Sequence, residues 1–197
     1  MIYIASKRKT VERLCKEYPG AKLVDVTSSS ESEWSKLSPF YPHGGIPVPN
    51  SDGYFATCVE AIWQGLKIFS STDIDISLFS NATMRNLKRT VRKFGLPLGH
   101  RYGVGSNKIL SYIDARKLIY IPSYNWMLSN KAKSLVDKLA NIASQRDVVL
   151  LDYDTNSDVN NPSKPLSHAS LIKTYIENNY TLPAKTIPYQ PSLFDYE

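Results

Sequence analysis

The stretch 53–69 constrains the fold most, because it predicts a helix from about Thr57 that is apolar on almost every side. Its apolar residues are Val59, Ala61, Ile62, Trp63, Leu66, Ile68 and Phe69. A helix of this kind is buried. Glu60, Gln64 and Lys67 recur at i, i+4 and i+7 and would share one face of the helix. Because buried polar groups need partners or a ligand, this face is the predicted wall of an active site.

The same residues also fit a purely structural role, which the sequence leaves open. Thr57 and Glu60 match a capping box, in which the carboxylate only closes the start of the helix. Lys67 would lie in the last helical turn, where its ammonium group could reach water and interact favourably with the helix dipole.

Length and composition indicate one globular domain. For the 197 residues we expect a single domain over 1–180 and an extended arm over 181–197, where prolines recur without a helix or strand period. No apolar run approaches the length of a membrane span. The N-terminal apolar residues precede the charges, opposite to the order in a secretory signal, so we expect a cytoplasmic protein. Two cysteines are too few for a zinc site, and we expect no metal.

Basic residues exceed acidic ones by 24 to 18, which gives a formal charge of +6. This excess favours an anionic partner such as a nucleotide or nucleic acid, and it equally fits a soluble surface. The basic residues concentrate at 7–9 and 85–101, the second group mostly on a helix predicted from Asn81 to about Phe94. A non-catalytic nucleic-acid- or nucleotide-binding protein that uses the 85–101 stretch is therefore the alternative function.

Short apolar runs predict a small, partly parallel β-sheet within an α+β fold. The predicted strands are 2–5, 22–26, 117–121 and 148–151. Asp152 and Asp154 directly follow the last of them, and ligands of open α/β sheets bind beyond the carboxyl ends of strands. His168 stands near a later helix start, either on the surface or in the pocket.

Residues 38–53 form a long predicted loop that contains four prolines and three glycines. Several segments in and after this loop resemble the NADAR family, which contains riboflavin-biosynthesis-associated N-glycosidases and enzymes that remove ADP-ribose from guanine. The similar segments are Ser38-Pro-Phe-Tyr-Pro42, Ile46-Pro-Val48, Tyr54, Glu60-Ala-Ile-Trp-Gln64-Gly-Leu-Lys67 and Lys88-Arg89. The resemblance covers about residues 37–95. The family usually has Asn where Pro39 stands, and its Trp-Gly-rich C-terminal motif has no clear counterpart here.

The resemblance implies a helix-rich NADAR-like core and an N-glycosidase that cleaves a base–ribose bond without a cofactor. The implied partner is a nucleotide or an ADP-ribose-type small molecule, free or on modified nucleic acid. Glu60 would act as electrostatic stabiliser or general base and Lys67 as a Schiff-base nucleophile. With the resemblance, the expected substrate-binding residues are Phe40, Tyr41, Trp63, Gln64, Arg89 and Arg101, to which the predicted strand end adds Asp152 and His168. Of these, Tyr41 or Trp63 would stack on the base, and the arginines, like Arg85 and Lys88, would meet phosphates.

Overall fold

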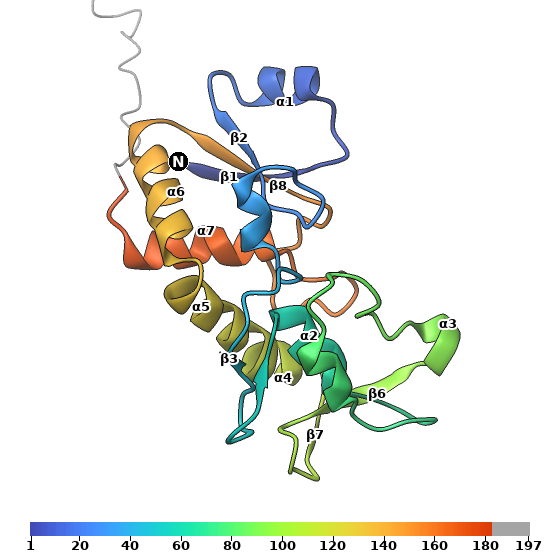
Figure 1. The fold of residues 1–197 in the computed structure, drawn as a ribbon. Coiled ribbons are helices and arrows are strands. Elements are labelled where there is room, and N and C mark those ends of the chain that lie inside the picture. Colours follow the sequence, from blue (N-terminus) through green and yellow to red (C-terminus); the bar gives the residue numbers. More distant parts are fainter. Residues whose placement is uncertain (183–197) are drawn as a thin grey trace, which may run out of the picture.

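The computed structural model describes residues 1–182, and within them the chain has an α+β fold with three small sheets (Figure 1). The predicted arm over 181–197 falls almost wholly outside the described residues. No helix within residues 1–182 is long and apolar enough to cross a membrane.

The N- and C-terminal parts of the chain meet in a parallel sheet. Its strands are β1 (Ile2–Ser6), β8 (Val148–Asp152) and β2 (Lys22–Asp25), in the order β1-β8-β2. Both outer strands pair in parallel with β8, whose buried run Val148–Leu150 is continuous. The strands predicted near 2–5, 22–26 and 148–151 are therefore confirmed.

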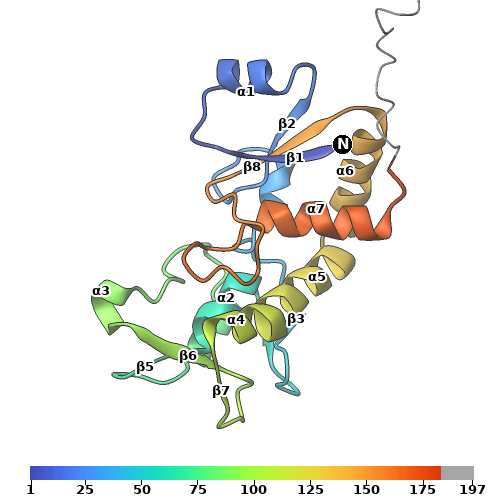
Figure 2. The same ribbon diagram turned by 180° about the vertical axis from the view of Figure 1, so that it is seen from behind.

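Helices connect and cover these strands. Between β1 and β2 lies α1 (Val11–Glu17), which Thr10 caps by accepting a hydrogen bond from the Arg13 amide. α6 (Lys133–Gln145) leads into β8, and α7 (His168–Asn179) lies below the sheet, where it contacts β1 and β8 (Figure 2). Together they place the carboxyl ends of all three strands on one edge.

The middle of the chain forms a second group of elements. They are η1 (Glu33–Leu37), β3 (Ile46–Pro47), β4 (Phe55–Ala56), α2 (Val59–Gly65), β5 (Lys67–Phe69), η2 (Ile76–Ser80), α3 (Val91–Phe94), β6 (Pro97–Arg101) and β7 (Ile109–Leu110). β5, β6 and β7 make an antiparallel sheet, and β3 pairs with β4. One buried core nevertheless joins both groups, from Val24 through Ile62 to Leu128.

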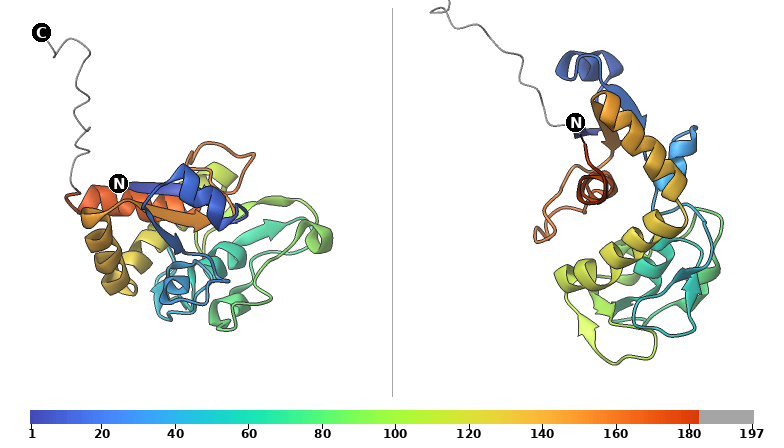
Figure 3. Two further views of the ribbon diagram at one scale, coloured as in Figure 1. Left: turned by 90° about the horizontal axis from the view of Figure 1, so that it is seen from above. Right: turned by 90° about the vertical axis from the view of Figure 1, so that its left-hand side faces the viewer.

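A run of helix over residues 112–130 joins the two groups, and it corrects the predicted strand 117–121. It consists of α4 (Tyr112–Ala115), the π-helix η3 (Arg116–Tyr120) and α5 (Ile121–Asn130). The right-hand view of Figure 3 shows this run between the two groups of elements. Pro122 follows directly after the π-helix η3 within this continuous run and lacks the amide hydrogen that an α-helical bond would use. A short apolar run fits a buried strand and a buried helix equally well, so the pattern at 117–121 could not distinguish them. In the structure the run is helical and buries Ile119 in the core.

The helix predicted from Asn81 to Phe94 is also wrong, because only α3 is helical. Met84 and Asn86 have φ values of 58° and 57°, which an α-helix excludes. The Asn81 side chain accepts from Thr83 and donates to the Arg85 carbonyl, so it closes a turn instead of capping a helix.

Candidate active site

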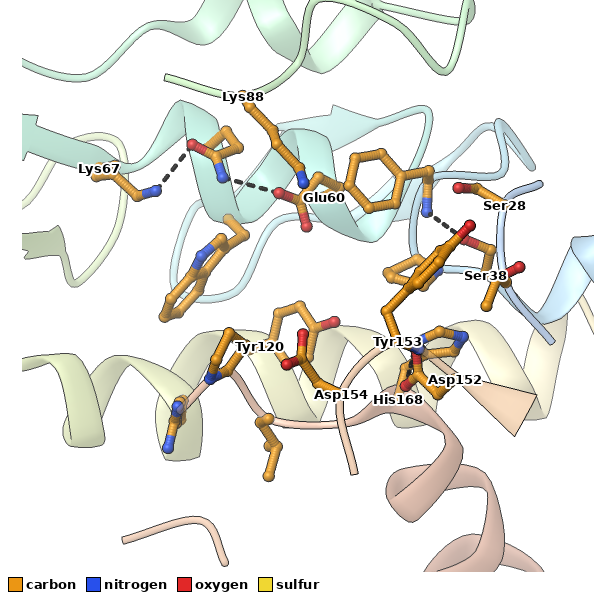
Figure 4. A pocket seen from close by; sticks show the side chains of 18 of the residues that line it. Ser28, Ser38, Glu60, Lys67, Lys88, Tyr120, Asp152, Tyr153, Asp154 and His168 are labelled. Atoms are coloured by element: carbon orange, nitrogen blue, oxygen red, sulfur yellow. Dashed lines mark hydrogen bonds and ion pairs between the residues drawn. The ribbon is translucent and has the colours of Figure 1, made fainter. Parts of the chain in front are cut away.

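A cavity of about 650 Å³ lies between the carboxyl edge of the parallel sheet and helix α2 (Figure 4). Its lining is Arg8, Thr27, Ser28, Ser38, Pro39, Phe40, Glu60, Trp63, Gln64, Lys67, Lys88, Arg89, Thr90, Val91, Tyr112, Arg116, Tyr120, Asp152, Tyr153, Asp154, Pro165, Leu166 and His168. The polar stripe of residues 60–67 and the strand end at Asp152, which are far apart in sequence, thus face one cavity. Tyr41 and Arg101 lie outside it.

Three side chains form a hydrogen-bonded chain along one wall. Gln64 donates from Nε2 to Oε1 of Glu60 at 2.8 Å, and Lys67 donates from Nζ to Oε1 of Gln64 at 2.8 Å. Lys67 does not share the helix, because α2 ends at Gly65 and Lys67 begins β5. A Cβ on Gly65 would lie 2.4 Å from the Phe79 ring. The close approach of η2 therefore requires glycine at this helix end.

The capping-box role of Glu60 is excluded. The N-cap of α2 is Cys58, whose Sγ accepts a hydrogen bond from the Ala61 amide at 3.3 Å. The Thr57 hydroxyl instead donates to the Asn81 carbonyl at 2.6 Å. Glu60 is 7% exposed, and its carboxylate is directed into the cavity (Figure 4).

Burial perturbs both ionisable ends of this chain. Desolvation raises the pKa of Glu60, although the Gln64 hydrogen bond and the charges of Lys67 and Lys88 partly oppose the rise. Desolvation also lowers the pKa of Lys67, against the attraction of the Glu60 charge. Such paired perturbations in a cavity are typical of reactive groups.

Aromatic rings surround this wall. The Trp63 ring packs on the ring of His100, with their centroids 3.8 Å apart. The Tyr120 ring contacts Trp63 edge-on, with their centroids 5.5 Å apart. Burial lowers the pKa of His100 to about 3, so the stacked imidazole is neutral. Burial holds the pKa of Tyr120 well above its usual range, so its phenol remains a hydrogen-bond donor. Tyr41 lies outside the cavity lining, where its ring packs at a tilt against His43.

Of the three arginines expected to meet phosphates, Arg85 lies outside the cavity lining, and Arg89 and Arg101 have guanidinium groups bound elsewhere in the protein. The guanidinium of Arg89 donates to the carbonyls of Lys67 and Asp73, and only its backbone amide reaches the polar chain, at 3.0 Å from Oε1 of Gln64. Arg101 forms an ion pair with Asp73 at 2.6 Å. Lys88 makes no ion pair among residues 1–182, and its Nζ lies 5.5 Å from the centre of the Phe40 ring.

The strand end forms the opposite wall, where Asp152 and His168 bind each other. His168 Nδ1 lies 3.0 Å from Oδ2 of Asp152, and its Nε2 donates to the Val26 carbonyl at 2.8 Å. Burial alone would raise the pKa of Asp152. Hydrogen bonds from His168 and Ser167 outweigh burial, and this pKa lies below its usual value. The pair joins the start of α7 to the end of β8 and to Val26, which directly follows β2.

Several lining residues were not predicted. Arg8 follows β1, and Tyr120 lies on η3, so only the folded arrangement brings them to the cavity. Buried Arg116 donates to the carbonyls of Val159 and Asn161, at 3.1 and 2.6 Å, and thereby fixes the loop after β8. The basic run 7–9 was the sole sequence signal for Arg8.

Within residues 1–182 no cluster of three His, Cys, Asp or Glu side chains could hold a metal ion.

Comparison with protein families gives one match, over residues 6–172, to a family of unknown function (DUF6939). The chain belongs to this family. The DUF6939 match contains the whole cavity lining, from Arg8 to His168. No curated protein gives a significant match, and no solved structure does.

Proposed function

We propose that the cavity hydrolyses the N-glycosidic bond between a base and a ribose, in a nucleotide-derived metabolite or an ADP-ribosylated base. The observation that carries the proposal is the hydrogen-bonded Glu60–Gln64–Lys67 chain, which presents a carboxylate with a raised pKa to a cavity of about 650 Å³. That volume suits a nucleotide-sized ligand.

Glu60 is suited to the central step. When the bond from C1′ of the ribose to the base breaks, its electron pair leaves with the base and positive charge develops on the sugar. A carboxylate in a water-poor site stabilises that charge. It also accepts a proton from the water whose oxygen bonds to C1′ and then releases this proton to solvent, while the departing base takes up a proton from solvent.

Lys67 offers a covalent route to the same products. Its lowered pKa favours the neutral amine, which is nucleophilic. The amine nitrogen bonds to C1′ as the base leaves with the electron pair and one amine proton. The ring then opens to an imine as the second proton moves to the ring oxygen. Water hydrolyses the imine and restores the lysine.

The remaining lining supplies binding groups. Phe40 and Trp63 offer ring surface to a base, and the protonated Tyr120 phenol offers a donor. Lys88 and Arg8 are cations that line the cavity and suit phosphate oxygens. Asp152 and His168 maintain the wall at the strand end.

A non-catalytic binding protein is the second candidate. The observation that favours it is the pocket's position at the carboxyl edge of a parallel sheet, where nucleotides bind in many folds without being cleaved. Of the basic residues in the stretch 85–101, only Lys88 and Arg89 line the cavity, and the Arg89 guanidinium is bound to the Lys67 and Asp73 carbonyls. For a nucleic-acid binder, affinity would fall steeply with salt and Glu60 would be dispensable.

The proposal is tested by incubating the protein with a panel of nucleotides and ADP-ribosylated guanosine while mass spectrometry follows the free base. A glycosidase releases the base from at least one member of the panel in a protein-dependent manner. Binding of panel members without any base release would favour the second candidate.

A further inference from the structure

The loop after β8 carries two carboxylates with opposite surroundings. Both oxygens of the Asp152 carboxylate accept hydrogen bonds from the protein: Oδ2 accepts from the Ser167 hydroxyl at 2.7 Å and lies 3.0 Å from His168, and Oδ1 accepts from the Tyr153 amide at 2.7 Å. It is 5% exposed. Asp152 thus holds the wall together and has little left to offer a ligand.

Asp154 lines the same cavity but differs from Asp152 in both burial and hydrogen bonding. It is only partly buried, and its carboxylate makes no hydrogen bond or ion pair with any of residues 1–182. Figure 4 shows it on the wall opposite Glu60, with its side chain directed into the cavity. A carboxylate accepts hydrogen bonds only, so groups that satisfy it must be donors.

We propose that Asp154 binds the vicinal hydroxyl groups of a ribose ring. Two neighbouring hydroxyls present two donors, which match the two oxygens of one carboxylate, and acidic side chains recognise ribose hydroxyls in this way in dinucleotide-binding folds. The sugar then lies between Asp154 and Glu60, with C1′ toward Glu60. The assignment rests on the proposed function for its substrate class, and within that class it favours ribosides over 2′-deoxyribosides.

The test compares ribose 5-phosphate with 2-deoxyribose 5-phosphate, which are fragments common to nucleotide glycosides and need no knowledge of the base. Titration followed by NMR or calorimetry measures both dissociation constants. The parent protein should bind ribose 5-phosphate more tightly than 2-deoxyribose 5-phosphate by about tenfold or more, the scale of a hydrogen bond to a charged group. Asp154→Asn should reduce this preference, and Asp154→Ala should abolish it.

Asp158→Asn is the matched control, because Asp158 is exposed on the same loop outside the cavity. It should keep the parent's preference. The proposal is overturned if the parent binds neither fragment, binds both equally, or keeps its preference in Asp154→Ala. Sugar discrimination without base release would uphold the ribose site and reject the glycosidase. Base release without discrimination between the two sugars would uphold the glycosidase and reject the ribose site.

Discussion

The side-chain amide of Gln64 is held in one orientation, with Nε2 donating to Glu60 at 2.8 Å. Its oxygen cannot replace the nitrogen there, because it accepts from Lys67 and from the Arg89 amide, which are both donors. Glu60 therefore receives a fixed donor on Oε1. This bond favours the charged carboxylate and opposes the rise in pKa that burial causes.

Gln64→Met removes that donor while keeping the side-chain length. The pKa of Glu60 should rise further, so the acid limb of the profile of kcat/KM against pH should move to higher pH if the ionised carboxylate is the working form. Kinetics across pH measure the shift. Gln145→Met, on the exposed side of α6, is the control. An unchanged acid limb in Gln64→Met would show that the hydrogen bond does not set this pKa.

Glu60→Gln should make the protein more stable at neutral pH. A carboxyl group whose folded pKa lies above its unfolded value, about 4.3, destabilises the fold above the folded pKa. That penalty disappears as the pH falls through the folded value toward the unfolded one. Urea unfolding at several pH values should show a gain for the variant at pH 7 that vanishes below about pH 4. Exposed Glu31→Gln should show no such gain.

His168→Ala should destabilise the fold by about 3–5 kcal/mol, because it leaves the Asp152 carboxylate buried without its main partner. Denaturant titration measures the loss. In a double-mutant cycle, Asp152→Asn combined with His168→Ala should cost clearly less than the two single changes together. Additive costs would mean that the two side chains do not stabilise each other.

The parallel sheet could be predicted because its strands are short apolar runs between helical or turn segments. The same reasoning failed at 117–121, where contacts with the core, which no local pattern reveals, select a helix. It failed again at 81–94, because the left-handed conformations of Met84 and Asn86 break a convincing amphipathic pattern.

The cavity was predictable where its residues are close in sequence. Glu60 and Gln64 are one helical turn apart, and Phe40 belongs to the preceding loop. Lys67 reaches Gln64 from β5, a contact that helix periodicity predicted for the wrong reason. Which strand-end carboxylate is free depends on Ser167 and His168, more than a dozen residues away, so the sequence could not distinguish Asp152 from Asp154.

Borohydride should trap a sugar on Lys67 if the covalent route operates. Reduction of the imine adds the sugar mass to the protein, and mass spectrometry of peptides locates it. Lys67→Ala should lose the adduct. Lys88→Ala is the control, because it removes a second lysine of the same cavity and should still be trapped. An adduct that persists in Lys67→Ala would assign the chemistry to another amine.

Turnover of Glu60→Gln tests the central claim most directly, with the best substrate from the nucleotide panel. Gln keeps the size and an acceptor for Gln64 but removes the charge. If Glu60 stabilises the developing cation or activates water, kcat should fall about a hundredfold or more. The dissociation constant of ribose 5-phosphate should stay near that of the parent, because the lost interaction forms in the transition state. Base release within about twofold of the parent rate would contradict a catalytic role for Glu60 and, with it, the proposed glycosidase site.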